Sequence, residues 1–184
     1  MRLFLIRHPR PAVDPDICYG SSDIAVAHKE MTTASARLLP QLPKGVPVFS
    51  SPLRRCAAFA ETIAAALGSS FPQCDARLME MDFGAWEMQR WDDIPRAEVD
   101  AWAADLAGFR PGGGETVREV AQRVLDFRAE LLNARLPQAL VVAHAGTIRL
   151  LLAARDSQAA EAVALSAAGA AHGIAYGELI LIEA

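Results

Sequence analysis

Residues 3–9 read Leu-Phe-Leu-Ile-Arg-His-Pro, an apolar run that stops at two basic side chains. Four consecutive apolar residues bounded by polar ones predict a strand that is buried on both faces, which is typical of a parallel sheet. Pro9 ends this strand and also restricts His8 to extended backbone geometry. The strand therefore delivers Arg7 and His8 to one edge of a sheet.

Three more apolar runs predict the remaining strands. Residues 46–49 lead to two serines and two arginines, and residues 140–143 lead directly to His144. Residues 178–182 predict a last strand near the end of the chain.

Helical patterns alternate with these strands, over about 30–41, 51–68, 95–106, 116–132 and the segment after His144. Ser51 suits the N-cap of the second helix and Pro52 its first helical position. Thr116 and Glu119 have the spacing of a capping box. The alternation predicts an α/β fold with three layers, in which a mostly parallel central sheet has helices on both faces. We expect residues 1–184 to form a single domain.

Composition narrows the classes of partner. The net charge is −4, which gives no reason to expect nucleic acid or an anionic membrane, so any phosphate site must be a local cluster of cations. The three cysteines lack a CxxC spacing, which argues against a disulfide framework and a thiolate zinc site. No apolar stretch approaches the roughly 20 residues of a membrane span, and the N-terminal run is too short for a signal peptide. We therefore expect a cytoplasmic protein.

Basic side chains gather where the predicted strands end. In open α/β sheets, ligands bind beyond the carboxyl ends of the strands. Arg54 and Arg55 lie in the first turn of a helix, where a cation opposes the helix dipole unless an anion binds there. Taken alone, Arg54 is better interpreted as an exposed side chain, and an isolated strand-end histidine needs no function. Together, the two histidines and the flanking arginines predict a phosphate site.

Four segments, in this order, carry a family resemblance. Leu5-Ile6-Arg7-His8 resembles the Arg-His-Gly signature of the histidine phosphatase superfamily, also called phosphoglycerate-mutase-like. Ser51-Pro52-Leu53-Arg54-Arg55 resembles its Ser-x-Leu-x-Arg helix start. Leu78-Met79-Glu80 with Phe83-Gly84-x-Trp86-Glu87 resembles the segment that holds its proton donor, and Val141-Val142-Ala143-His144 resembles its second histidine motif. The resemblance covers nearly the whole chain.

The resemblance implies a phosphohydrolase that uses no metal and no cofactor. His8 would attack phosphorus as the neutral imidazole. Arg7, Arg55 and His144 would bind the phosphoryl oxygens, for which the forked guanidinium is well suited. Glu80 would protonate the leaving alcohol and then deprotonate the water that hydrolyses the phosphohistidine. The implied partner is a small phosphorylated metabolite.

The chain departs from the family pattern around the first histidine. Pro9 replaces the usual Gly and has no N–H to donate, while Pro11 and Asp14 replace the usual Thr or Ser and Asn. Ala145-Gly146 replaces the usual Gly-Gly after the second histidine. An Asp near phosphate would repel it, so Asp14 either points away or helps to select the substrate. Its neighbours in the loop after His8 that could line a substrate pocket are Tyr19, Gly20 and Asp23.

Other prominent side chains have plainer interpretations. Phe83, Trp86 and Trp91 are interpreted as packing residues. His28 and His172 are interpreted as structural or exposed.

Several functional alternatives stay open at this point. A mutase of the same superfamily would move phosphate between hydroxyls, although the cofactor-dependent phosphoglycerate mutases are longer than this chain. A binder of phosphorylated ligands without turnover is compatible with the altered loop. A metallophosphatase built on His8 and His144 ranks lowest, because no closely paired metal ligands precede a strand end. Within the superfamily, α-ribazole-phosphate phosphatases are similar in size and motif order, which makes α-ribazole 5'-phosphate the leading specific substrate hypothesis.

Overall fold

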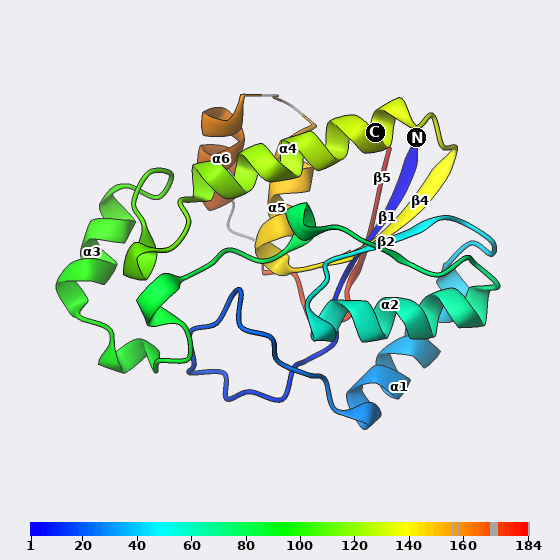
Figure 1. The fold of residues 1–184 in the computed structure, drawn as a ribbon, viewed down its shortest axis with the longest axis horizontal. Helices are drawn as coiled ribbons and strands as arrows, with labels where there is room; N and C mark the ends of the chain where they lie inside the picture. The colour runs from blue at the N-terminus through cyan, green and yellow to red at the C-terminus, as the bar shows by residue number, and fades with distance from the viewer. Residues whose placement is uncertain (156, 158, 170–172, 184) are drawn as a thin grey trace.

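The computed structural model describes residues 1–155, 157, 159–169 and 173–183. Its centre is a five-stranded sheet with the order β3-β2-β4-β1-β5 (Figure 1). The strands are β1 (Arg2–Arg7), β2 (Val48–Ser50), β3 (Gln73–Cys74), β4 (Gln138–Ala143) and β5 (Leu179–Glu183). The second strand thus begins two residues later than the apolar run predicts, after Pro47, which has no N–H for the sheet.

Parallel pairing aligns the ends of the central strands. Strand β4 pairs in parallel with both β1 and β2, and β2 pairs in parallel with β3, whereas β5 runs antiparallel to β1. The expectation of a mostly parallel sheet is confirmed. In the register of β1 and β4, Arg7 lies opposite Ala143. His8 and His144, the next residue of each strand, therefore leave the sheet side by side.

Helices cover both faces of the sheet, as predicted (Figure 1). Helices α1 (His28–Leu38) and α2 (Arg54–Leu67) lie on one face, and α4 (Val117–Asn133), α5 (Ala145–Ala153) and α6 (Ala160–Gly169) lie on the other. The alternation along β1 explains this, since Phe4 and Ile6 join the core of the first face and Leu3 and Leu5 that of the second. Within the described ranges, no helix is both long and apolar enough to cross a membrane.

A smaller apolar cluster lies beyond the sheet. Helix α3 (Arg96–Ala104) stands away from the three layers, at the left of Figure 1. Cys18, Trp86 and Ile94 are buried together, with Trp102 of α3 packed against them. This cluster ties the loop after β1 to the segment after β3, and both segments form walls of the cavity described below.

The helices differ most from the sequence expectation at α2 and α6. Helix α2 begins at Arg54, two residues after the predicted first position Pro52, because Leu53 is extended and the Ser51 hydroxyl accepts the Leu53 N–H in a local turn. Helix α6 was not anticipated, since its Ala-rich sequence carries no clear amphipathic period. The capping box of Thr116 and Glu119 is confirmed, with both reciprocal hydrogen bonds present.

Candidate active site

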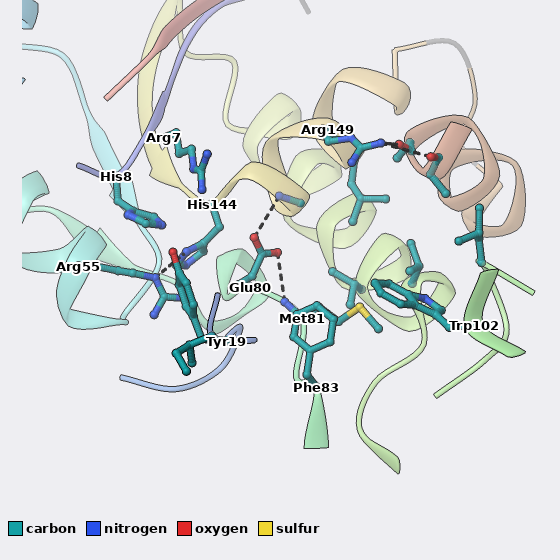
Figure 2. Close-up of a pocket in the computed structure, with 18 of the residues that line it drawn as sticks. Arg7, His8, Tyr19, Arg55, Glu80, Met81, Phe83, Trp102, His144 and Arg149 are labelled. Carbon is teal, nitrogen blue, oxygen red and sulfur yellow. Dashed lines mark hydrogen bonds between the residues drawn. The ribbon is translucent and has the colours of Figure 1, made fainter. Parts of the chain in front are cut away.

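A cavity of about 480 Å³ opens at the carboxyl ends of the parallel strands. The five residues that the sequence singles out for catalysis all line it: Arg7, His8, Arg55, Glu80 and His144. Figure 2 shows these side chains converging from separate elements, with Arg7 from the end of β1, Arg55 from α2 and His144 from the end of β4. The cavity sits where the fold class predicts a ligand site.

The hydrogen bond of His8 determines its tautomer. Its Nδ1 lies 2.7 Å from the carbonyl oxygen of Pro9. A carbonyl can only accept, so Nδ1 carries the proton and Nε2 keeps a lone pair. Pro9 thus contributes its carbonyl to the site, and its missing N–H has no bearing on this contact. The second ring nitrogen of His8 is a potential nucleophile.

Burial keeps His8 uncharged. The side chain is 2% exposed, and this burial lowers its pKa from the ordinary 6.5 to about 3. The hydrogen bond to Pro9 opposes the shift, and the nearby Arg55 and Arg7 reinforce it. The imidazole is therefore neutral, and its lone pair available, throughout the physiological pH range.

Arg55 is a fully buried cation that bonds to carbonyls and an imidazole. Its Nη2 donates to the Gly20 carbonyl at 2.5 Å, its Nη1 to the Ser22 carbonyl at 2.6 Å, and its Nε to Nδ1 of His144 at 3.2 Å. These bonds use three of the five guanidinium N–H groups, so two remain for a ligand. No carboxylate in the described part of the chain forms an ion pair with it.

The Arg7 guanidinium is held by two residues of the segment before β5. Its Nη1 donates to the Ile174 carbonyl at 2.5 Å, and its guanidinium carbon lies 3.8 Å from the centre of the Tyr176 ring. Its Nε is buried and has no hydrogen-bond partner. Arg7 lines the cavity and no described residue accepts a hydrogen bond from its Nη2, so this nitrogen can donate to an anion bound there.

His144 has the opposite tautomer to His8. Because Arg55 donates to its Nδ1, that nitrogen is unprotonated, and Nε2 carries the proton that it donates to the Ser51 hydroxyl at 2.8 Å. Burial, and next the charge of Arg55, hold the pKa of His144 well below its ordinary value. Both ring nitrogens are engaged by the protein, so a contact from His144 to a phosphoryl oxygen requires exchange of one of these bonds.

We call Arg7 and Arg55 the cation cluster. Glu80 lies between this cluster and the rest of the cavity (Figure 2). Its Oε2 accepts the N–H of Gly146 at 3.0 Å, in the first turn of α5, and its Oε1 accepts the N–H of Met81 at 3.2 Å. A β-carbon at position 146 would lie only 2.4 Å from Oε1, so glycine is required for this approach. The carboxyl group is thereby fixed by two backbone N–H groups, one of them in the first turn of α5.

An arginine from α4 holds the backbone that carries Glu80. Nη1 of Arg123 donates to the carbonyls of Met79 at 2.6 Å and Arg77 at 2.8 Å, and its Nη2 donates to that of Glu80 at 3.2 Å. Glu115 accepts from the same guanidinium at 3.0 Å. Arg123 is therefore a positioning residue that sequence reasoning missed, since its partners lie more than 40 positions away.

Glu87 organises the loop whose carbonyls bind Arg55. Its carboxylate accepts the backbone N–H groups of Gly20, Ser21, Ser22 and Phe83. Burial opposes ionisation of this carboxyl, but the hydrogen bonds from Ser22 and these amides lower its pKa overall. The Glu of the Phe-Gly-x-Trp-Glu segment thus fixes the acceptors that the buried Arg55 needs.

The other half of the cavity is mostly apolar. We call it the apolar half, and its apolar side chains include Met81, Phe83, Trp91, Trp102, Leu106 and Leu150. One cation, Arg149, also lines the cavity on this side and donates to the Ala167 and Ala168 carbonyls (Figure 2). The rings of Trp91 and Trp102 are parallel within 5°, with centres 6.5 Å apart. Phe83 and Trp91 therefore contribute to the cavity wall as well as to packing, whereas Trp86 is buried and donates to Glu98.

Of the loop residues predicted to line a substrate pocket, only some lie at the cavity. Tyr19 lines it, and the Gly20 carbonyl reaches Arg55. Asp14 is half-exposed and points to Arg90, at 3.9 Å. Asp23 caps α2 from outside by accepting the N–H of the exposed Arg54 at 2.7 Å. His28 is exposed at the start of α1, and His172 falls outside the described residues.

Tyr176 is one of the cavity residues that no sequence pattern indicated. It precedes β5, lies against Arg7, and its hydroxyl is 2.8 Å from that of Tyr19. No motif surrounds it, and its neighbours in space come from the beginning of the chain.

Comparison with known proteins agrees with this geometry. The sequence profile of the histidine phosphatase superfamily (branch 1) matches residues 3–169. The adenosylcobalamin/α-ribazole phosphatase of Escherichia coli is 32% identical over 172 residues, which cover 89% of this chain and 83% of the relative.

Two solved structures share the fold. The α-ribazole phosphatase of Shigella flexneri superposes with a TM-score of 0.81 and 26% identity, covering 100% of this chain and 90% of that one. The mycobacterial glucosyl-3-phosphoglycerate phosphatase superposes with a TM-score of 0.78 and 27% identity, covering 99% of this chain and 89% of that one.

The lowered pKa of His8 predicts a pH dependence of stability. Between pH 6.5 and about 3 the unfolded chain binds a proton at this residue and the folded protein does not, so acidification favours unfolding. Replacing His8→Asn removes this effect. From pH 6.5 to 4.5, the free energy of unfolding should fall by roughly 2 kcal/mol less in the variant than in the wild type. Urea denaturation at both pH values measures this, and equal falls in the two proteins would contradict it.

Proposed function

The chain belongs to the histidine phosphatase superfamily, and we propose that it hydrolyses small phosphomonoesters through a phosphohistidine on His8 without a metal ion. The observation that carries the proposal is the orientation of His8. A neutral imidazole with a free Nε2 lone pair lies in a cavity with Arg7 and Arg55, two guanidinium groups that have unused donors. This is the combination that phosphoryl transfer requires.

In the first step, Nε2 of His8 forms a bond to phosphorus as the ester P–O bond breaks. The unused N–H groups of Arg7 and Arg55 bind the equatorial phosphoryl oxygens. Glu80 enters this step protonated and gives its proton to the leaving oxygen, so that the alcohol departs neutral. The place of Glu80 between the cation cluster and the apolar half supports this assignment.

In the second step, a water molecule replaces the alcohol. Glu80, now a carboxylate, takes a proton from the water as its oxygen attacks phosphorus and the P–N bond breaks. Inorganic phosphate leaves, His8 recovers its lone pair, and Glu80 is protonated again. Protons therefore balance over the two steps with no other acid or base.

The arginines supply the positive charge that a metal ion provides in other phosphatases. Across the part of the chain that the structure describes, no group of three or more His, Cys, Asp or Glu side chains is arranged to hold a metal ion. The charge of the two arginines supports metal independence as part of the proposal.

The apolar half supports a class of leaving group. Stacked indole rings and aliphatic side chains next to Glu80 favour an alcohol with a planar apolar group. α-Ribazole 5'-phosphate, whose base is a benzimidazole, has this chemistry, and relatives named as α-ribazole phosphatases share the fold. We propose it as the leading specific substrate. We further propose that the enzyme acts in the cytoplasm, because all three of its cysteines are free thiols.

The first prediction concerns the nucleophile. His8→Ala should reduce hydrolysis of p-nitrophenyl phosphate by at least about a thousandfold, measured in the presence of a chelator, because it removes the lone pair proposed to attack phosphorus. His28→Ala is the matched control, since His28 is exposed at the start of α1. It should retain wild-type activity. Activity that the chelator abolishes, or that survives in His8→Ala, would rule out the mechanism.

The second prediction separates the two roles of Glu80. Nitrophenolate is a good leaving group and needs no proton, but breakdown of the phosphohistidine still needs a base. Glu80→Gln should therefore release a burst of about one nitrophenol per active site, followed by turnover about 10²–10⁴-fold slower than in the wild type. Rapid-mixing absorbance measures the burst.

An alkyl phosphate should give no burst with Glu80→Gln, because its alcohol cannot leave unprotonated. Glu61→Gln, at an exposed position of α2, is the control and should behave as the wild type. A Glu80→Gln enzyme that turns over both substrates at wild-type rates would exclude Glu80 as the acid and base.

The third prediction tests the leaving-group class. α-Ribazole 5'-phosphate and 1-naphthyl phosphate should have kcat/KM values at least about tenfold above those of glycerol 3-phosphate and phosphoserine. Trp91→Ala should lower kcat/KM about tenfold for the first pair and less than about twofold for the second. Phe71→Ala removes an exposed aromatic ring elsewhere and serves as the control. Equal kcat/KM values across the four substrates would refute the proposed class.

A further inference from the structure

The segment 174–178, which precedes β5, wraps the end of β1. The Gly177 N–H donates to the carbonyls of Arg7 at 3.1 Å and His8 at 3.2 Å, and the Arg7 N–H donates to the Glu178 carbonyl at 3.1 Å. The backbone of the two residues that end β1 is therefore tied to the C-terminal part of the chain. Tyr176 projects from this segment into the cavity wall.

The Tyr176 ring contacts the first strand's functional side chains. The guanidinium carbon of Arg7 lies 3.8 Å from the ring centre, and the imidazole centre of His8 lies 5.7 Å from it. A second cation, Arg10, lies farther away, at 5.5 Å. The short distance to Arg7 is well within the range of a cation–π interaction.

Tyr19 contacts Arg55 through its ring, as Tyr176 contacts Arg7. The guanidinium carbon of Arg55 lies 5.3 Å from the centre of the Tyr19 ring. The hydroxyls of Tyr19 and Tyr176 are 2.8 Å apart and hydrogen-bonded. The two tyrosines therefore join the loop after β1 to the segment before β5, and each faces one of the two arginines.

We propose that Tyr176 is a positioning residue for phosphate binding, which holds the Arg7 guanidinium by its ring and is itself held by the hydroxyl of Tyr19. The inference rests on the proposed function in so far as Arg7 binds the phosphoryl group. It assigns a role in the site to a residue outside the four sequence motifs.

The chemistry of the ring explains why an aromatic residue suits this place. A carboxylate beside Arg7 would occupy its N–H groups and repel the substrate dianion. The face of an aromatic ring attracts the cation but accepts none of its in-plane N–H groups. With Nη1 fixed by the Ile174 carbonyl and the flat face fixed by Tyr176, the Arg7 guanidinium keeps one orientation, and its Nη2, from which no described residue accepts a hydrogen bond, remains available.

The hydrogen bond between the hydroxyls of Tyr19 and Tyr176 has a separate and smaller role in positioning Arg7. It fixes the plane of the Tyr176 ring across the cavity, so removing either hydroxyl breaks the same hydrogen bond. Burial raises the pKa of Tyr19, and the hydrogen bond with Tyr176 adds to the shift, so the phenol stays neutral at working pH. The ring and the hydroxyl can therefore be tested independently.

The test measures inorganic phosphate binding by isothermal titration calorimetry, which needs no turnover. Tyr176→Leu should weaken phosphate binding about tenfold, because it removes the ring. Tyr176→Phe should weaken it less than about threefold, because the ring remains. Tyr19→Phe should match Tyr176→Phe, and the double Phe variant should be no weaker than either single one, since all three lack the same hydrogen bond.

A double-mutant cycle shows whether the effect passes through Arg7. In an Arg7→Met background, Tyr176→Leu should change phosphate binding less than about twofold. Equal losses with and without Arg7, or a Tyr176→Leu protein that binds phosphate as the wild type does, would overturn the inference. If Tyr176→Leu does not fold, Tyr176→Met carries the same expectations.

The outcomes distinguish this inference from the proposed function. A wild-type protein that binds phosphate but hydrolyses no ester would refute the proposed function, and the cycle would still decide the role of Tyr176. A wild-type protein that hydrolyses esters while Tyr176→Leu binds phosphate normally would refute only the inference. No phosphate binding by the wild type at millimolar concentration would refute the inference as well.

Discussion

The buried guanidinium of Arg55 is the constraint on which the site depends. A cation taken out of water without a carboxylate partner is costly unless its donors are well bonded. The protein meets this need with the Gly20 and Ser22 carbonyls and with Nδ1 of His144. Glu87 in turn holds the loop that presents these carbonyls, through amide N–H bonds. No carboxylate among the described residues forms an ion pair with Arg55, so an anion bound in the cavity would neutralise its charge.

The same constraint determines the proton positions on the two histidines. Arg55 can only donate, so His144 accepts at Nδ1, carries its proton on Nε2 and donates a hydrogen bond from Nε2 to the Ser51 hydroxyl. His8 donates Nδ1–H to the Pro9 carbonyl, which leaves its Nε2 free. Two histidines whose ring centres are 5.1 Å apart thus have opposite tautomers, because one neighbour is a donor and the other an acceptor. Replacement of the family's glycine by Pro9 leaves this arrangement intact, since the contact uses only a carbonyl.

Sequence patterns predict the strands and helices that carry the site, but they predict few of the contacts between its side chains. The apolar runs predict the described strands except β3, whose two residues Gln73 and Cys74 are exposed, and they predict the mostly parallel order. The matched register of β1 and β4 explains why His8 and His144 emerge together. The sequence predicts the start of α2 two residues too early, because Ser51 is used by a turn and by His144 and is not the N-cap. Phe83 and Trp91 were interpreted as packing alone, although α3 brings Trp102 against them and makes the apolar half of the cavity.

What the sequence determined by itself was local: which segments form strands and helices, where the strands end, and which charged residues follow them. Periodicity and capping chemistry act over a few residues and can be recognised in a single chain. Only the tertiary structure decided that Tyr176 meets Tyr19 across 157 positions, that Arg123 holds the backbone of Glu80, and that Asp14 turns to Arg90. These contacts depend on how the layers pack and how the loops return over the sheet. The sequence around a side chain has no periodic pattern that identifies a partner far away in the chain.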